Sequence, residues 1–106
     1  MPMLIAYGVY TIEYMEDPDD EFPGSIMETW RVGEAIHRES GPAKTWRDIV
    51  TGNVLKQEYH QHGKLHRTGA PAVILYDLET GDIAETSFYE WGEKREGAQD
   101  APHPPS

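Results

Sequence analysis

The stretch GKLHRTGAPAVILYDLETGDIAETSFYEW, Gly63 to Trp91, contains two strand-like segments separated by turn residues. Its segments 72–77 and 83–91 are rich in β-branched and aromatic residues, which favour strands. Between them, LETGD supplies a glycine for a position of positive φ in a tight turn. Two strands joined by a short turn predict a β-hairpin.

An earlier stretch of the chain repeats this unit. The sequence GEAIHRESGPA, residues 33–43, resembles GKLHRTGAPA, and His37 and His66 lie 29 positions apart (66 − 37). Repeats of this period indicate stacked supersecondary units. Gly33 precedes Gly63 by 30 positions (63 − 33), so we expect one extra residue in the first copy. The same spacing of 29 joins Arg38 to Arg67, Pro42 to Pro71, Ala43 to Ala72, Asp48 to Asp77, Thr51 to Thr80, Gly52 to Gly81 and Gly63 to Gly92.

Outside this unit, further strands are expected in short segments separated by turn residues. No helical period of useful length is present. The sequence predicts an all-β domain over residues 1–96, a twisted antiparallel meander of two hairpin repeats of about 29 residues each. The Pro-rich segment 97–106 lacks periodicity and is expected to be a disordered tail. The other expected strands are 3–14 with a bend at Gly8, 25–32, 44–49 and 54–61, and the acidic segment 13–21 is expected to be a solvated loop.

Several aromatic residues fall on these strands and need cover, because a lone sheet exposes two faces. Either the sheet curls on itself or two chains pair face to face, and we favour the homodimer. An excess of aromatic side chains on one face is alternatively a binding patch for a partner. The residues concerned are Trp30, Trp46, Tyr59, Phe88, Tyr89 and Trp91.

Composition restricts the partners. The 106-residue chain has a net charge of −10, which opposes direct binding of nucleic acid and suits a basic protein partner. It contains no cysteine, which fits a cytoplasmic protein. The first 14 residues lack the basic region of a signal peptide, and no apolar run is long enough to predict a membrane span.

Most of the repeated residues have a structural interpretation. The aspartate and glycine of D-x-x-T-G form turns, the proline begins a strand, and the alanine packs inward. The pairs His37–Arg38 and His66–Arg67 also suit an anion site, since Arg binds carboxylates and phosphates. We favour a structural role for them, in which Arg binds a carboxylate or a backbone carbonyl and His stacks on an aromatic ring. The other candidate binding residues are the aromatic Trp30, Tyr89 and Trp91.

His60 and His62 are weak candidates for a metal site. At positions i and i+2 of a strand they face the same side. In the repeat, however, Trp30 and Tyr89 correspond to His60, and Val32 and Trp91 correspond to His62. These positions hold packing side chains, so we predict no metal or other cofactor.

The motif Y-x-x-x-G-K-L-H-R-x-x-A-P-A, Tyr59 to Ala72, resembles a repeat of small phage and bacterial proteins of unknown function, W/Y-x-x-N-G-K-x-H-R-x-D-G-P-A. Those proteins are similar to MORN-type repeats. The resemblance covers Trp30 to Arg95 and implies β-hairpins and an interaction role, with no catalytic residues. The chain departs from the pattern at Ser40 and Gly69, which replace the aspartate, and at Ala70, which replaces a glycine.

Three functions are compatible with these patterns. The first is a non-enzymatic protein-interaction module. The second is an acidic inhibitor of the phage or mobile-element type that mimics nucleic acid. Carboxylates spread evenly over the surface would favour this function, and carboxylates confined to residues 13–21 would oppose it. The third is an enzyme or a binder of small ligands or anions, which requires both His-Arg pairs to meet in one exposed pocket with weakly bonded arginines.

Overall fold

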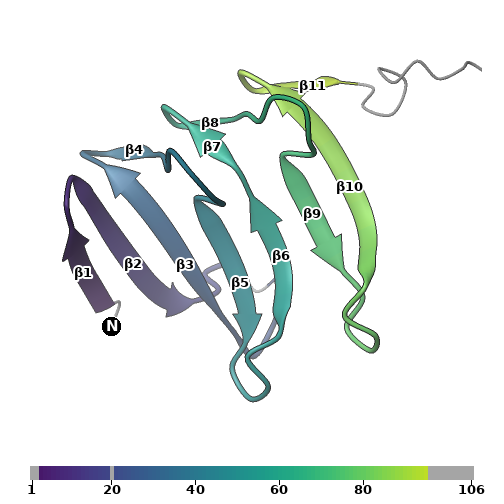
Figure 1. The fold of residues 1–106 in the computed structure, drawn as a ribbon. Coiled ribbons are helices and arrows are strands. Elements are labelled where there is room, and N and C mark those ends of the chain that lie inside the picture. Colours follow the sequence, from purple (N-terminus) through teal and green to yellow (C-terminus); the bar gives the residue numbers. More distant parts are fainter. Residues whose placement is uncertain (1–2, 20, 96–106) are drawn as a thin grey trace, which may run out of the picture.

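The computed structural model of the protein describes residues 3–19 and 21–95, and confirms the all-β class. Within those residues there are β-strands and no helix, hence no helix that crosses a membrane. The strands form an antiparallel meander that does not close into a barrel (Figure 1). The expected tail, 97–106, lies outside the described residues.

The main sheet runs in the order β1-β2-β3-β5-β6-β9-β10-β11, so neighbours in space are nearly always neighbours in sequence. Its strands are β1 (Met3–Tyr7), β2 (Tyr10–Glu16), β3 (Ser25–Val32), β5 (Lys44–Asp48), β6 (Val54–Glu58), β9 (Val73–Tyr76), β10 (Ile83–Glu90) and β11 (Glu93–Arg95). Short strands extend the hairpins: β4 (Ala35–Ile36) pairs with β3, and β7 (His60–Gln61) pairs with β8 (Lys64–Leu65).

The N-terminal segment differs from the expected single strand over 3–14. The chain reverses at Gly8, whose φ is 62°, so that Tyr7 pairs with Tyr10. A two-residue turn needs positive φ, which glycine adopts at little cost. The reversal places β1 beside β2, at the outer edge of the sheet (Figure 1).

The 29-residue spacing recurs in the backbone hydrogen bonds. The Trp30 amide donates to the carbonyl of Ala43, and the Tyr59 amide donates to that of Ala72, both at 2.8 Å. Ala43 and Ala72 are fully buried, as expected from their size. The two connections therefore return to the sheet in the same way.

The extra residue expected in the first copy is absent. Gly33 and His62 each begin a two-residue turn, with φ of 62° and 52°, because the flanking pairs are Val32–Ala35 and Gln61–Lys64. Gly33 therefore corresponds to His62 and not to Gly63. The turn at Trp91 (φ 50°) closes the β10–β11 hairpin in the same way, as a third copy.

The long hairpins have the predicted turn chemistry. Asp48 Oδ1 accepts the amides of the second and third residues after it, at 2.8 and 2.9 Å. Asp77 Oδ1 accepts the equivalent amides at the same distances. Gly52 and Gly81 follow with φ of 78° and 82°, in the left-handed region. The D-x-x-T-G motif is therefore a turn.

One face of the sheet holds the main apolar cluster, and we call it the covered face. Met27 pairs with Trp46 across the strands, and both pack with Leu55. Phe22, from the loop between β2 and β3, packs on this cluster with its ring 6.3 Å from that of Trp46. The expectation of a solvated acidic loop is thus wrong in part: β2 continues to Glu16, and the loop covers the core.

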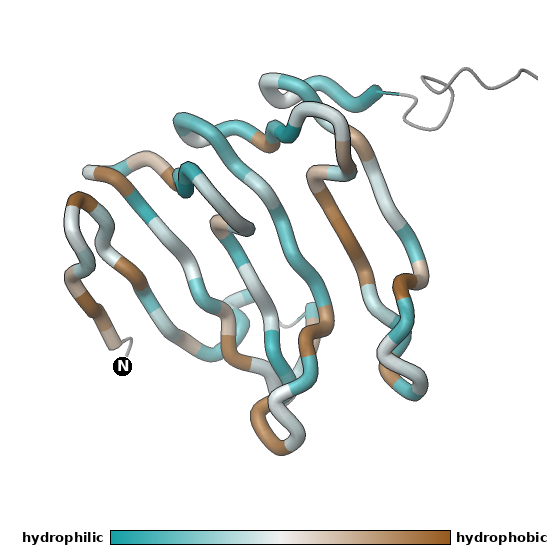
Figure 2. The backbone as a smooth tube through the Cα atoms, viewed as in Figure 1, coloured by the Kyte–Doolittle hydropathy of each residue, from teal (hydrophilic) through white to brown (hydrophobic). Residues whose placement is uncertain are grey.

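We call the opposite face the open face. At the edge of the sheet, β1 consists mostly of hydrophobic residues (Figure 2). Side chains alternate between the two faces along a strand, so residues next in sequence to those of the covered cluster have their side chains on the open face. Trp30 is buried there between Tyr7 and Tyr10, with edge-to-face ring distances of 5.9 and 5.0 Å. Met3 and Tyr7 remain more than half exposed. The aromatic residues are therefore divided between the faces, since Trp46 lies on the covered face.

Candidate functional site

Both repeated arginines are stacked on aromatic rings. The guanidinium carbon of Arg38 lies 3.6 Å from the centre of the Trp30 ring, and that of Arg67 lies 3.8 Å from the centre of the Tyr59 ring. One nitrogen of each guanidinium also donates to the carbonyl of the proline four residues later, at 3.1 and 3.2 Å. The arginines thus hold their own connections against the sheet.

Both repeated histidines bind the turn of the next copy. His37 Nδ1 accepts the amide of His62 at 2.9 Å, and His66 Nδ1 accepts the amide of Trp91 at 3.0 Å. Because a backbone amide only donates, Nδ1 carries no proton in either ring, which assigns the Nε2–H tautomer. Each histidine therefore links one copy to the next.

Backbone hydrogen bonds reinforce the same junction. The Arg38 amide donates to the carbonyl of His60 at 3.4 Å, and the Arg67 amide donates to that of Tyr89 at 3.1 Å. In the third copy Arg95 occupies the position of the repeated histidine. A guanidinium cannot accept a hydrogen bond from a backbone amide. The third copy therefore lacks the acceptor that would bind the turn of a fourth copy.

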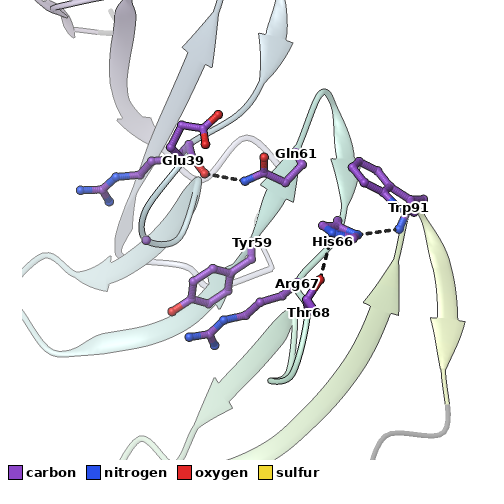
Figure 3. A pocket seen from close by; sticks show the side chains of 9 residues that line it. Glu39, Tyr59, Gln61, His66, Arg67, Thr68 and Trp91 are labelled. Atoms are coloured by element: carbon purple, nitrogen blue, oxygen red, sulfur yellow. Dashed lines mark hydrogen bonds between the residues drawn. The ribbon is translucent and has the colours of Figure 1, made fainter.

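Four of the predicted binding residues line one pocket of about 360 Å³, namely Arg38, His66, Arg67 and Trp91 (Figure 3). Gln61, which was not predicted, also lines it and donates to the carbonyl of Arg38 at 2.8 Å. The predicted residues His37, Trp30 and Tyr89 are absent from this lining.

The pocket meets the condition for an anion site only in part. The two arginines share it, but each is stacked on a ring and bonded to its own connection. The carboxylate-bearing Glu39 also lines the pocket. Trp91, 53 % exposed, stacks on His66 with ring centres 3.8 Å apart. This geometry favours a structural role for the His-Arg pairs.

His60 and His62, the weak candidates for a metal site, are not arranged as a pair of ligands. His60 is buried and its Nε2 lies 3.0 Å from Glu58 Oε1, whereas His62 lies in a turn with positive φ. In the true register His60 corresponds to Arg31, and His62 to Gly33. Within residues 3–19 and 21–95 no group of three potential ligands is close enough to hold a metal.

Glu58 lies in a charged cluster on the covered face. Lys56 Nζ lies 3.2 Å from carboxylate oxygens of both Glu58 and Glu21, and 5.0 Å from the Trp46 ring centre. Burial raises the pKa of Glu58, but the hydrogen bond with His60 and the charge of Lys56 outweigh it and hold the pKa below 4.5. The carboxylate is thus stabilised in its charged form.

Acid is therefore expected to destabilise the fold. Hydrogen bonds from turn amides hold the pKa of Asp48 and Asp77 below 3.8, in the same direction as Glu58. A lowered folded-state pKa gives stability that is complete above the unfolded value and is lost as the pH falls through the folded value. The contribution of these carboxylates to the melting temperature should thus be level above about pH 5 and fall below it. Thermal melts from neutral to acid pH test this, and Asp48→Asn with Asp77→Asn should flatten the fall.

An apolar groove lies beside the edge of the sheet. Met3 and Ile5 on β1, Tyr14 on β2 and Ile26 on β3 line a volume of about 820 Å³. Glu16 and Asp17 also line it, with Met15 and Pro18. Asp17 Oδ2 accepts the Phe22 amide at 2.7 Å, which fixes this carboxylate at the groove. The sequence offered one signal for this groove, the uncharged run MLIAY of β1.

Comparisons with protein families, with curated proteins and with solved structures gave no match for this chain.

Proposed function

We propose that the protein is a non-enzymatic interaction module that binds a protein partner in the groove of the open face. The apolar groove with its carboxylates carries this proposal. Exposed contiguous apolar surface with a polar rim is typical of interaction sites. The polar side chains of the repeated motif, by contrast, are bonded within the fold.

The groove favours a partner segment that is apolar and flanked by lysine or arginine. Met3, Ile5 and Ile26 offer apolar contact, and Glu16 and Asp17 attract cations. The net charge of −10 adds long-range attraction for a basic protein. We place this interaction in the cytoplasm, because the chain has no cysteine that an oxidising compartment would pair.

Three synthetic peptides test the proposal by fluorescence anisotropy: alternating Leu-Lys, Ser-Lys and Leu-Glu. We expect binding of Leu-Lys only. Ile26→Lys should weaken it about tenfold or more, because it removes an apolar contact and adds a like charge. Val50→Lys is the matched control, since Val50 is 88 % exposed on a hairpin tip outside the groove. Equal binding by both variants contradicts the proposal.

The acidic-inhibitor function is a second candidate, which the charge distribution favours. Exposed carboxylates are not confined to the segment 13–21. The peptides separate the two functions, because a mimic of nucleic acid binds Ser-Lys as tightly as Leu-Lys. Beyond that segment, exposed acidic residues occur at Glu34, Glu39, Asp77, Glu79, Asp82, Glu85 and Glu93.

A further inference from the structure

The two outer edges of the sheet differ in their protection. Proteins guard edge strands with charges, prolines, bulges or covering segments, because an unguarded edge pairs with other chains. At one edge, β10 has a register shift between Ile83 and Glu85, a carboxylate at Glu85, and β11 along its last residues. At the other edge, β1 reads MLIAY, with no charge, no proline and no break in its register with β2.

The side chains and outward backbone groups of β1 are accessible. All five residues are exposed, with Met3 at 61 % and Leu4 at 63 %. Tyr7 and Tyr10 flank a two-residue turn, which makes them a hydrogen-bonded pair. Such pairs alternate along an antiparallel ladder, so the amides and carbonyls of Ala6 and Leu4 point away from β2.

We infer that two copies of this chain pair through β1, antiparallel, about a two-fold axis at Ile5. In this register Leu4 lies opposite the partner's Ala6. The outward amide of each donates a hydrogen bond to the outward carbonyl of the other. Ile5 lies opposite the partner's Ile5 as a non-hydrogen-bonded pair, which the alternation requires at that position. The edge is thus complementary to itself, as a two-fold interface must be.

The charges beside this edge allow a second copy to pair with it. Glu13 lies opposite Leu4, one strand back from the seam, and its Oε1 is 3.4 Å from an Arg31 nitrogen. No carboxylate therefore meets its own copy across the edge. Face-to-face pairing on the open face would instead bring the groove carboxylates Glu16 and Asp17 towards those of a second acidic chain.

Pairing at β1 joins the two open faces into one. Met3, Ile5 and Tyr7 of each copy flank the seam, so that two grooves lie on the same side of a continuous sheet. The inference depends on the backbone of β1 and not on the proposed partner. An edge of five residues gives an interface below about 1,200 Å², which predicts weak, reversible association.

Analytical ultracentrifugation of the full chain from about 10 µM to 1 mM tests this inference. We expect a monomer–dimer equilibrium that shifts towards dimer with added salt, because salt screens the repulsion of two acidic chains. Ala6→Pro removes an outward amide without affecting the β1–β2 ladder, and should abolish the dimer. Ala6→Val keeps the amide and should leave the dimer intact.

Three results would overturn the inference: a monomer throughout the range, a dimer that Ala6→Pro leaves unchanged, or assemblies larger than a dimer. Circular dichroism establishes that Ala6→Pro is folded. If it is not, Ala6→Glu decides. That variant adds a like charge to each acidic chain at the seam and preserves the backbone, so it should weaken the dimer at least tenfold at low salt. An unchanged dimer then counts against β1.

Discussion

Trp46→Ala is expected to lower the free energy of unfolding by about 3–5 kcal/mol, the range for truncation of a buried tryptophan. Trp46 is 4 % exposed and packs with Met27 and Leu55 in the main cluster of the covered face. Phe22 and Lys56 also contact or approach its ring. Since domains of this size have about 5–15 kcal/mol of stability, the variant should be largely destabilised.

Urea unfolding followed by far-ultraviolet circular dichroism measures this effect. Trp91→Ala is the matched control, because the Trp91 side chain is 53 % exposed. The hydrogen bond from the Trp91 backbone amide to His66 does not need that side chain. Its loss should stay below about 1 kcal/mol. If Trp46→Ala costs no more than Trp91→Ala, the covered face is not the core.

Arg38→Ala and Arg67→Ala are each expected to lower stability by about 2–3 kcal/mol. Each variant loses a cation–π contact, which contributes up to about 2 kcal/mol. Each also loses a hydrogen bond from a charged donor to a carbonyl, which contributes about 1.5–3 kcal/mol. Partial solvent exposure of the arginines lowers both contributions. Arg→Lys should retain little of this, because an ammonium lacks the planar fork that stacks and donates together. The stacking distances of 3.6 and 3.8 Å predict similar losses at the two sites.

Urea unfolding of these variants distinguishes a structural motif from a ligand site. Arg47→Ala is the control, since Arg47 is an exposed arginine of β5. It should change stability by less than about 0.5 kcal/mol. A structural role predicts lost stability for both repeated arginines. Unchanged stability in either would return that arginine to the list of candidate binding residues.

The strands and hairpin turns could be predicted from the sequence because their causes are local. Alternating β-branched and aromatic residues identify strands such as 25–32, which matches β3. The D-x-x-T-G motif contains both the acceptor and the glycine of its turn. The turns at His62 and Trp91 were harder, because residues other than glycine rarely adopt positive φ. These two turns are identified only by the residues that pair on either side of them in the flanking strands.

The contacts of the His-Arg motif could be predicted only in part. The bond from Arg to a backbone carbonyl was expected, and it forms within the connection. The partners of His37 and His66 lie 25 residues further along the chain, in the next copy, and no local pattern names them. The groove was not predicted, because it depends on the reversal at Gly8 that places 3–7 beside β2.

The tautomers of His37 and His66 test the central claim most directly, namely that the repeated motif joins successive copies of the hairpin. Nitrogen-15 spectra of the imidazoles at mildly alkaline pH distinguish a protonated Nδ1 from a bare one. We predict a bare Nδ1 and a protonated Nε2 in both rings, with the amides of His62 and Trp91 protected from exchange. A proton on Nδ1 of either ring would contradict the claim, because that nitrogen could not accept the amide.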